Sequence, residues 1–244
     1  MKKITLGLIF LLVMCLFAGC GKNADNNTDN KSIIAEIQQT LNQNDTQVLI
    51  AFGDNFDAKE GLIQSSELHS EGLIALCTNP EPMNLNSDTV QKWFKEAIER
   101  TELTAEQEIQ IAKIGEFAYN QALVLKTNLT GAGLVAVCEN PGCMNLKSDT
   151  VQKWFNEAIE RTELTVEQEI QIAKIGEFAY NQALLLKTNL TGAGLVAVCE
   201  NPGSMNLKSD TVQKWFKEAI ERTELTEEQK ALIANSKIKG LGLF

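Results

Sequence analysis

Histidine is almost missing from this sequence. The 244 residues include a single histidine, His69. A Ser–His or Cys–His nucleophile requires a histidine base, and a catalytic zinc site usually uses more than one histidine ligand. His69 lies in a polar stretch just before a helix expected to start at Ser70, so we interpret it as a surface residue. A glycine-rich phosphate loop, an HExxH motif and an EF-hand loop are also missing. We therefore expect no enzymatic activity, no catalytic residue, no cofactor and no metal.

Basic residues are outnumbered by acidic ones. Lysine and arginine contribute 22 residues and aspartate and glutamate 32, so the net charge is -10 at pH 7. The net charge becomes -12 without residues 1–19, which hold two lysines and no acid. Nucleic-acid binding relies on basic stripes that face the phosphates, and adsorption to anionic lipid head groups relies on basic clusters. The composition therefore excludes nucleic acid as an expected partner and indicates a solvated, self-repelling surface.

Long apolar runs are limited to the beginning of the chain. Residues 4–17 are apolar apart from Thr5 and Gly7, and they follow Lys2 and Lys3. This run is shorter than the roughly 20 residues that a membrane-spanning helix needs. A charged start followed by a short apolar run and small residues is typical of a secretory signal rather than a membrane span.

The signal ends in Leu16, Phe17, Ala18, Gly19 and Cys20. This segment resembles the lipobox of bacterial lipoproteins, from which Phe17 departs, since leucine is commoner three residues before the cysteine. The resemblance covers residues 1–20 and implies that residues 1–19 are cleaved and that Cys20 is lipidated. The protein would then be exported and anchored by lipid to a bacterial membrane, at the outer face of the cell membrane or in the outer membrane. The alternative is an ordinary secretory signal with an incidental cysteine.

Residues 20–31 consist of Cys20 and a stretch without large apolar side chains. Such a stretch buries too little apolar surface to offset the entropy lost on ordering. We interpret it as a flexible tether.

The rest of the chain is a tandem repeat, in which the sequence that starts at residue 84 starts again at residue 145. Residues 84–144 and 145–205 are two copies that differ at five positions: Asn86/Lys147, Lys95/Asn156, Ala105/Val166, Val124/Leu185 and Cys143/Ser204. A truncated third copy occupies residues 206–244, and a divergent first repeat occupies residues 32–83. Near-identical copies between atypical ends are typical of a stacked array. The sequence therefore predicts an all-α, solenoid-like fold built from tandem 61-residue helical repeats.

Apolar spacing and capping residues predict the helices of each copy. The apolar stripe of a first helix, which we expect to be capped by Asp88, consists of Val90, Trp93, Phe94, Ala97 and Ile98. A second helix is expected from Thr104, which forms a capping box with Gln107, through Gly115 to residue 126. There a close helix contact at Gly115 would compensate for its low helix propensity. The segment 130–142 is interpreted as a short helix ended by Asn140 and Pro141, with a short strand over Leu134 to Cys138 as the alternative.

Tryptophan and cysteine recur with the repeat period. We interpret Trp93, Trp154 and Trp215 as core residues, because each lies on the apolar stripe beside a phenylalanine. Cys77, Cys138 and Cys199 each end an apolar run and read as small buried side chains. A disulfide between Cys138 and Cys143 is possible in an exported protein, and free thiols are the alternative.

Two functions from different classes fit these observations. The first is a membrane-anchored surface lipoprotein whose repeats bind an envelope or extracellular protein or act as a spacer. The second is an envelope hydrolase with paired carboxylates, for which the candidates are Glu96, Glu99, Glu102, Glu106 and Glu108. We favour the first, because glutamates on helix faces and first turns are explained by solvation and by the helix dipole.

Replacement of the lipobox cysteine tests the anchor. The Cys20→Ala protein is expected to take up no labelled fatty acid and to leave the membrane fraction, because one thiol carries the lipid. Fractionation after growth with labelled palmitate measures both. A Cys20→Ala protein that keeps the label and stays with the membranes would contradict the lipobox interpretation.

Overall fold

The computed structural model describes residues 55–66 and 68–241. Their regular structure is entirely helical, with α-helices α4–α15, one 3-10 helix and no strand, which confirms the all-α prediction. The expected signal, the lipidated Cys20 and the tether lie outside the described residues. The chain divides into two compact units, Met1–Met83 and Asn84–Phe244, and the second begins where the first full copy of the repeat begins.

In the N-terminal unit the described helices are α4 (Phe56–Gln64) and α5 (Ser70–Thr78), which pack against each other. Ile63, Leu73 and Leu76 of these helices are fully buried. The chain also buries Lys59, whose ammonium donates to the carbonyl of Asn79 at 2.8 Å and to that of Glu81. The amine therefore satisfies backbone groups at the end of α5 that no helix bond uses.

Each complete copy in the C-terminal unit folds into four helices. The helices are α6 (Asp88–Arg100), α7 (Ala105–Ile114), α8 (Phe117–Leu125), α9 (Gly131–Glu139), α10 (Asp149–Arg161), α11 (Val166–Ile175), α12 (Phe178–Leu186) and α13 (Gly192–Glu200). The truncated copy forms α14 (Asp210–Arg222), α15 (Glu227–Asn235) and η1 (Lys239–Leu241). Short connections join successive helices. We call α6 with α7, α8 with α9 and the equivalent pairs of the later copies hairpins, so a copy consists of two successive hairpins.

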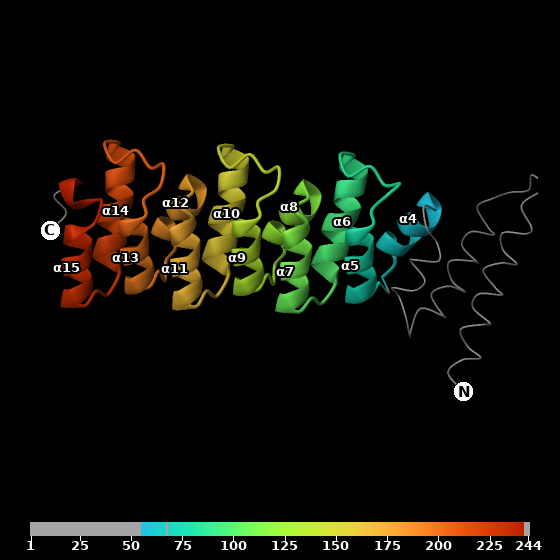
Figure 1. Ribbon diagram of the computed structural model, residues 1–244, viewed down its shortest axis with the longest axis horizontal. Coiled ribbons are helices and arrows are strands. Elements are labelled where there is room, and N and C mark those ends of the chain that lie inside the picture. The colour runs from blue at the N-terminus through green and yellow to red at the C-terminus, as the bar shows by residue number, and fades with distance from the viewer. Residues whose placement is uncertain (1–54, 67, 242–244) are drawn as a thin grey trace, which may run out of the picture. The chain divides into compact units, whose positions relative to one another are not determined.

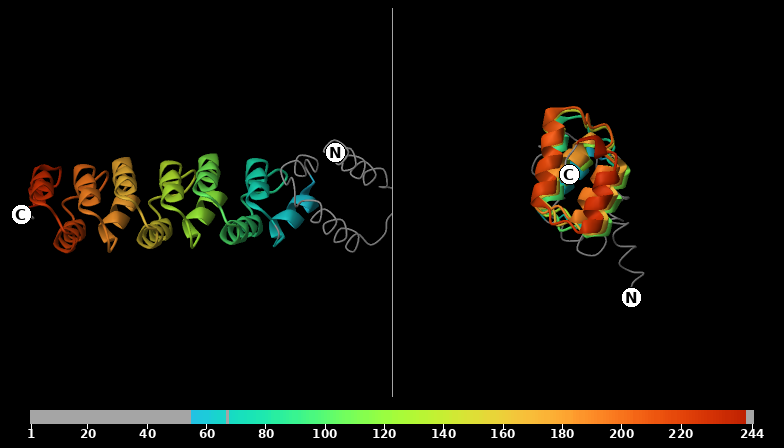
Figure 2. Two further views of the ribbon diagram at one scale, coloured as in Figure 1. Left: turned by 90° about the horizontal axis from the view of Figure 1, so that it is seen from below. Right: turned by 90° about the vertical axis from the view of Figure 1, so that its left-hand side faces the viewer.

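The helices of the C-terminal unit form two layers. One layer holds α6, α8, α10, α12 and α14, and the other holds α7, α9, α11, α13 and α15, and each helix packs on the next of its layer. Figure 2 shows the same two layers from a view along the row. The helices within a layer run parallel. This direction is seen in the contact of Lys126, at the end of α8, with carbonyls at the end of α6. Likewise Glu108 in the first turn of α7 contacts Thr130 at the start of α9.

Most of the apolar stripe of the first helix is buried as its spacing predicts, and Trp93 at its edge stays partly exposed. Val90, Phe94, Ala97 and Ile98 of α6 are buried, and the Phe94 ring lies 4.7 Å from the Tyr119 ring of α8. The buried valine, phenylalanine and isoleucine each contribute about 1.5–3 kcal/mol, and the aromatic pair adds about 0.5–1.5 kcal/mol. The expected cap is wrong by one residue, since the helix begins at Asp88 and Ser87 is the N-cap.

The prediction of one long second helix in each copy is wrong, because the helix ends at Gly115 and a new helix begins at Phe117. Gly115 has a φ of +77°, which ends α7 in the left-handed conformation that glycine adopts without strain. Its close neighbour is the backbone of Gly142, where an added Cβ would overlap the carbonyl oxygen of Gly115. The glycine therefore serves a turn and a backbone contact, and not a helix crossing.

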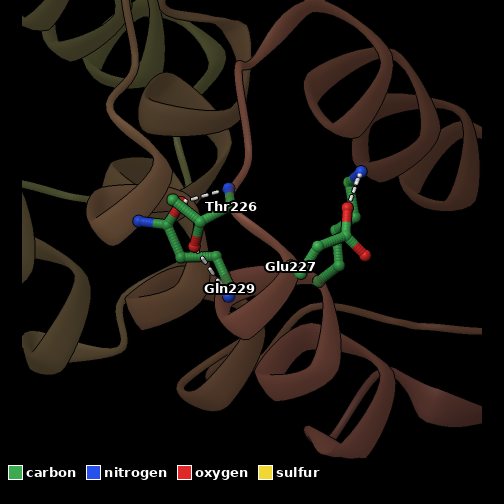
Figure 3. Close-up of polar contacts among 4 residues, drawn as sticks. Thr226, Glu227 and Gln229 are labelled. Atoms are coloured by element: carbon green, nitrogen blue, oxygen red, sulfur yellow. Dashed lines mark hydrogen bonds and ion pairs between the residues drawn. The ribbon is translucent and has the colours of Figure 1, made fainter.

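The other local predictions are confirmed. Thr104 and Gln107 form the expected capping box at the start of α7, and the equivalent boxes begin α11 and α15. Figure 3 shows the last of these, in which Thr226 and Gln229 exchange hydrogen bonds of 3.0 and 3.2 Å. The ambiguous segment is helix α9, which ends at the C-cap Asn140 as predicted.

Adding one methyl group at Gly142 tests the backbone contact. Gly142→Ala is expected to lower the free energy of unfolding by about 2 kcal/mol or more, because φ is +61° and the new Cβ meets the Gly115 carbonyl. Urea denaturation measures the loss. Gly240→Ala is the control, since a Cβ there meets nothing within 4 Å. Equal stability of the two variants would contradict the contact.

Candidate functional site

A repeated set of buried polar contacts in the C-terminal unit lies where the two layers are joined. Because the helices of a layer are parallel, the C-terminal ends of α6, α8, α10, α12 and α14 lie at one edge of the C-terminal unit. The N-terminal ends of α7, α9, α11, α13 and α15 lie at the same edge. The residues there share the pattern basic–Thr–x–Leu–Thr, at 100–104, 126–130, 161–165, 187–191 and 222–226. We call these five segments the connection edge. Sequence reasoning missed the pattern, because the segments are spaced unevenly, with a shorter step from position 100 to 126 than from 126 to 161.

The last threonine of each segment caps the helix that follows. Thr104, Thr165 and Thr226 each accept a hydrogen bond from the third residue of their helix as part of a capping box. Thr130 and Thr191 do the same for Gly133 and Gly194, at 3.0 and 3.1 Å. Each cap is expected to contribute about 1 kcal/mol to stability.

In three of the segments the basic residue, Lys126, Arg161 or Arg222, satisfies helix carbonyls. Lys126 is 5 % exposed, and its ammonium lies 3.4 and 3.3 Å from the carbonyl oxygens of Glu99 and Thr101 at the end of α6. Arg161 reaches the preceding copy, where its guanidinium donates to the carbonyls of Val124 and, at 3.0 Å, of Lys126. A cation at a helix C-terminus is stabilised by the helix dipole. Lysine therefore joins α8 to α6 within a copy, and arginine joins α10 to α8 between copies.

The next junction repeats the arginine contact. Arg222 at the end of α14 donates to the carbonyls of Leu185 and, at 3.1 Å, of Lys187. Both arginines thus bind the carbonyls of a lysine segment in the copy before them.

A buried glutamate meets the N-terminal end of α9 in the other layer. Glu108 is fully buried, and one carboxylate oxygen accepts from the Thr130 amide at 3.0 Å and from the Thr130 hydroxyl at 2.5 Å. Glu169 binds Thr191 with the same two distances. Gly133 leaves room for this carboxylate, because a Cβ there would overlap it. Burial raises the pKa of the Glu108 carboxyl, and the Thr130 hydrogen bonds offset part of that rise.

A second, exposed glutamate holds each turn after the lysine. Glu99 accepts from the Thr127 amide at 3.0 Å, and Glu160 accepts from the Thr188 amide at 2.9 Å. The hydrogen bonds from Thr188 lower the pKa of the Glu160 carboxyl. These carboxylates stay ionised and fix the turn between two hairpin helices.

The five glutamates considered for catalysis are distributed over several surroundings. Glu96 and Glu99 are exposed on α6, Glu102 and Glu106 are exposed near the start of α7, and Glu108 is the buried one. Glu96 pairs with Lys92 at 3.8 Å, and Glu108 binds Thr130. In residues 55–66 and 68–241, no three histidine, cysteine, aspartate or glutamate side chains gather so that they could hold a metal ion.

The tryptophans are only partly buried, so a fully packed core position is wrong for them. Each ring lies at the margin of its helix stripe, while the adjacent Phe94, Phe155 and Phe216 are fully buried. The Trp215 ring lies 6.2 Å from the ring of Phe178, the first residue of α12 in the preceding copy. The apolar stripe of this helix is wider than the surface that its neighbouring helices cover, so the tryptophan at the edge of the stripe remains in contact with solvent.

The cysteines separate into buried and exposed thiols. Cys77, Cys138 and Cys199 are buried, and burial raises the pKa of the Cys199 thiol to about 12, so it stays protonated. The structure has Cys138 and Cys143 as free thiols, the alternative to the possible disulfide between them. Cys138 belongs to the core face of α9, whereas Cys143 lies beyond the Gly142 turn and is exposed. The single histidine, His69, is exposed just before α5, as expected of a surface residue.

No protein-family model, curated protein or solved structure matches this chain. Within the part of the chain that the structure describes, none of the helices combines the length and the apolarity needed to cross a membrane.

The buried glutamate is expected to make stability depend on pH. Because its folded pKa is raised, Glu108 contributes stability that is present below its unfolded pKa, about 4.3, and is lost as the pH rises through the folded pKa. Glu108→Gln keeps the neutral form at every pH. Its free energy of unfolding should therefore increase relative to the wild type between pH 4 and pH 7, as measured by urea denaturation.

The exposed Glu102→Gln removes the same charge and serves as the control. A Glu108→Gln protein that loses stability relative to the wild type as the pH rises would contradict the assignment.

Proposed function

We propose that this protein is a membrane-anchored surface lipoprotein of the bacterial envelope. Its helical repeats form a stacked, solenoid-like array that acts as a protein-binding or spacer module and not as an enzyme. The observation that carries the proposal is the repetition of one set of junction contacts. Arg161 and Arg222 occupy equivalent positions in successive copies and bind the end of the preceding hairpin in the same way.

The anchor rests on the beginning of the sequence. Lys2 and Lys3, the apolar residues 4–17 and the small residues before Cys20 form the signal that resembles a lipobox. Lipid at Cys20 would hold the repeats near a membrane, and the polar residues 21–31 would separate them from it. The excess of acidic residues agrees with attachment through lipid rather than through basic contacts to head groups.

The array rests on the order of contacts in the C-terminal unit. Every helix packs on the next helix of its layer, so the contacts follow the order of the chain. Stacks of this kind gain stability from each unit and from each interface between neighbours, and they present extended surfaces. The exposed ion pairs of the first helix, such as Lys92 with Glu96 and Lys153 with Glu157, keep that surface solvated.

Labelling of the exposed thiol tests export and anchoring together. A membrane-impermeant maleimide is expected to label Cys143 on intact cells, with the outer membrane permeabilised where the host has one. Cys143 is the exposed thiol among residues 55–66 and 68–241, and Cys143→Ser is the matched negative control. The labelled protein should sediment with membranes, and the Cys20→Ala protein should not. Labelling that appears only after lysis of the cytoplasmic membrane would contradict the proposal.

A further inference from the structure

The two interior junctions of the C-terminal unit are interchangeable. At the first, Arg161 binds the carbonyls of Val124 and Lys126, and the Gln168 side chain fills the space beside Gly131. At the second, the equivalent residues of the next copy repeat these contacts: Arg222 with Leu185 and Lys187, and Gln229 with Gly192. The hydrogen bond of 2.6 Å between Gln171 and Glu139 belongs to the first junction, since Leu232 replaces Gln171 at the second. Each copy therefore presents to the next copy the same carbonyls and the same glycine that the preceding copy presents to it.

The differences between the copies leave the arginine contacts unchanged. Val124 and Leu185 differ, but they contribute only their backbone carbonyls to these contacts. Ala105 and Val166 begin equivalent helices, and Cys143 and Ser204 lie in exposed connections. A copy that is added or removed consequently leaves every remaining junction with its native contacts.

The last hairpin differs from the interior ones and ends the stack. Lys230 occupies the position of the buried Glu108 and Glu169, and it is exposed and paired with Glu227 at 2.7 Å (Figure 3). Ile238 occupies the position of the exposed Glu116 and is itself buried. The last hairpin thus has an exposed ion pair where the other copies bury a carboxylate, and its helix α15 also exposes Leu232.

From these observations we infer that the number of full copies sets how far the last hairpin stands from the membrane. The repeats then act as a spacer of adjustable length rather than as a single binding site. This inference rests on the proposed lipid anchor. Packed helices lie about 8–10 Å apart, and each copy adds two helices to each layer, so a copy should add about 16–20 Å of reach.

Three chain lengths test the inference: the native protein, a variant without residues 145–205, and a variant in which residues 145–205 are duplicated. Each full-length lipidated protein carries Cys143→Ser and a dye at Lys237→Cys. Liposomes with acceptor-labelled head groups report the distance of the dye from the bilayer by energy transfer. We expect steps of about 16–20 Å per copy. A glycine–serine insertion as long as one copy is the control, since a flexible chain gives a broad distribution of distances.

The outcomes separate the inference from the proposed function. A distance between dye and bilayer that increases by a regular step with each added copy supports a spacer whose length the copies set. If the shortened variant does not fold, the native protein and the duplicated variant still provide this comparison. A dye distance that is the same at all lengths overturns it, as in an array that lies flat on the bilayer or closes into a globule. Aggregation of both variants overturns it as well, because the copies are then not interchangeable. The proposed anchor fails separately if the Cys20→Ala protein binds the liposomes as the native protein does.

Discussion

Parallel packing of the helices within each layer is the constraint on which the C-terminal unit depends. It places like ends of successive helices side by side, so partial negative charges gather at one end of a layer and partial positive charges at the adjoining end of the other. The unsatisfied carbonyls and amides of these ends would be costly if they were buried without partners. The chain meets this requirement with charges of opposite sign. Lys126 and Arg161 bind carbonyls in one layer, and Glu108 binds the amide and hydroxyl of Thr130 in the other.

The same requirement explains a difference between the divergent repeat and the copies. Asn120 of α8 donates its side-chain amide to the carbonyl of Asn140 at 2.5 Å, and Asn181 donates to Asn201 at 2.6 Å. In the divergent repeat the equivalent residue is Lys59, which donates to Asn79, the counterpart of Asn140. The side chain changes while the donor at the helix end is kept. What the fold retains is therefore the hydrogen bond to the carbonyl and not a particular residue.

These contacts also bear on the choice between the two functional hypotheses. The buried carboxylate that a hydrolase would need at a reacting centre is Glu108, and Thr130 already occupies one of its oxygens twice. Glu108 thus has a structural role at the start of α9, and the small neighbouring residue, Gly133, is explained by the room that the carboxylate takes. The repeated architecture supports a proposal in which length and surface matter more than one reactive position.

The sequence alone determined the helical class, the repeat period, the capping boxes and the short helix α9, because these follow from local spacing and from residues that interact within a few positions of each other. The lipobox resemblance belongs to the sequence alone as well. Only the tertiary structure decided that Gly115 ends a helix, since the Gly142 backbone that it meets follows two further helices, α8 and α9, along the chain. It also decided that the tryptophans stay half-exposed and that Glu108 and Lys126 are buried. From the sequence alone, a charged side chain is expected to be solvated. Here such side chains are buried because each hydrogen-bonds to the end of a parallel neighbouring helix, and only the packing decides which helix that neighbour is.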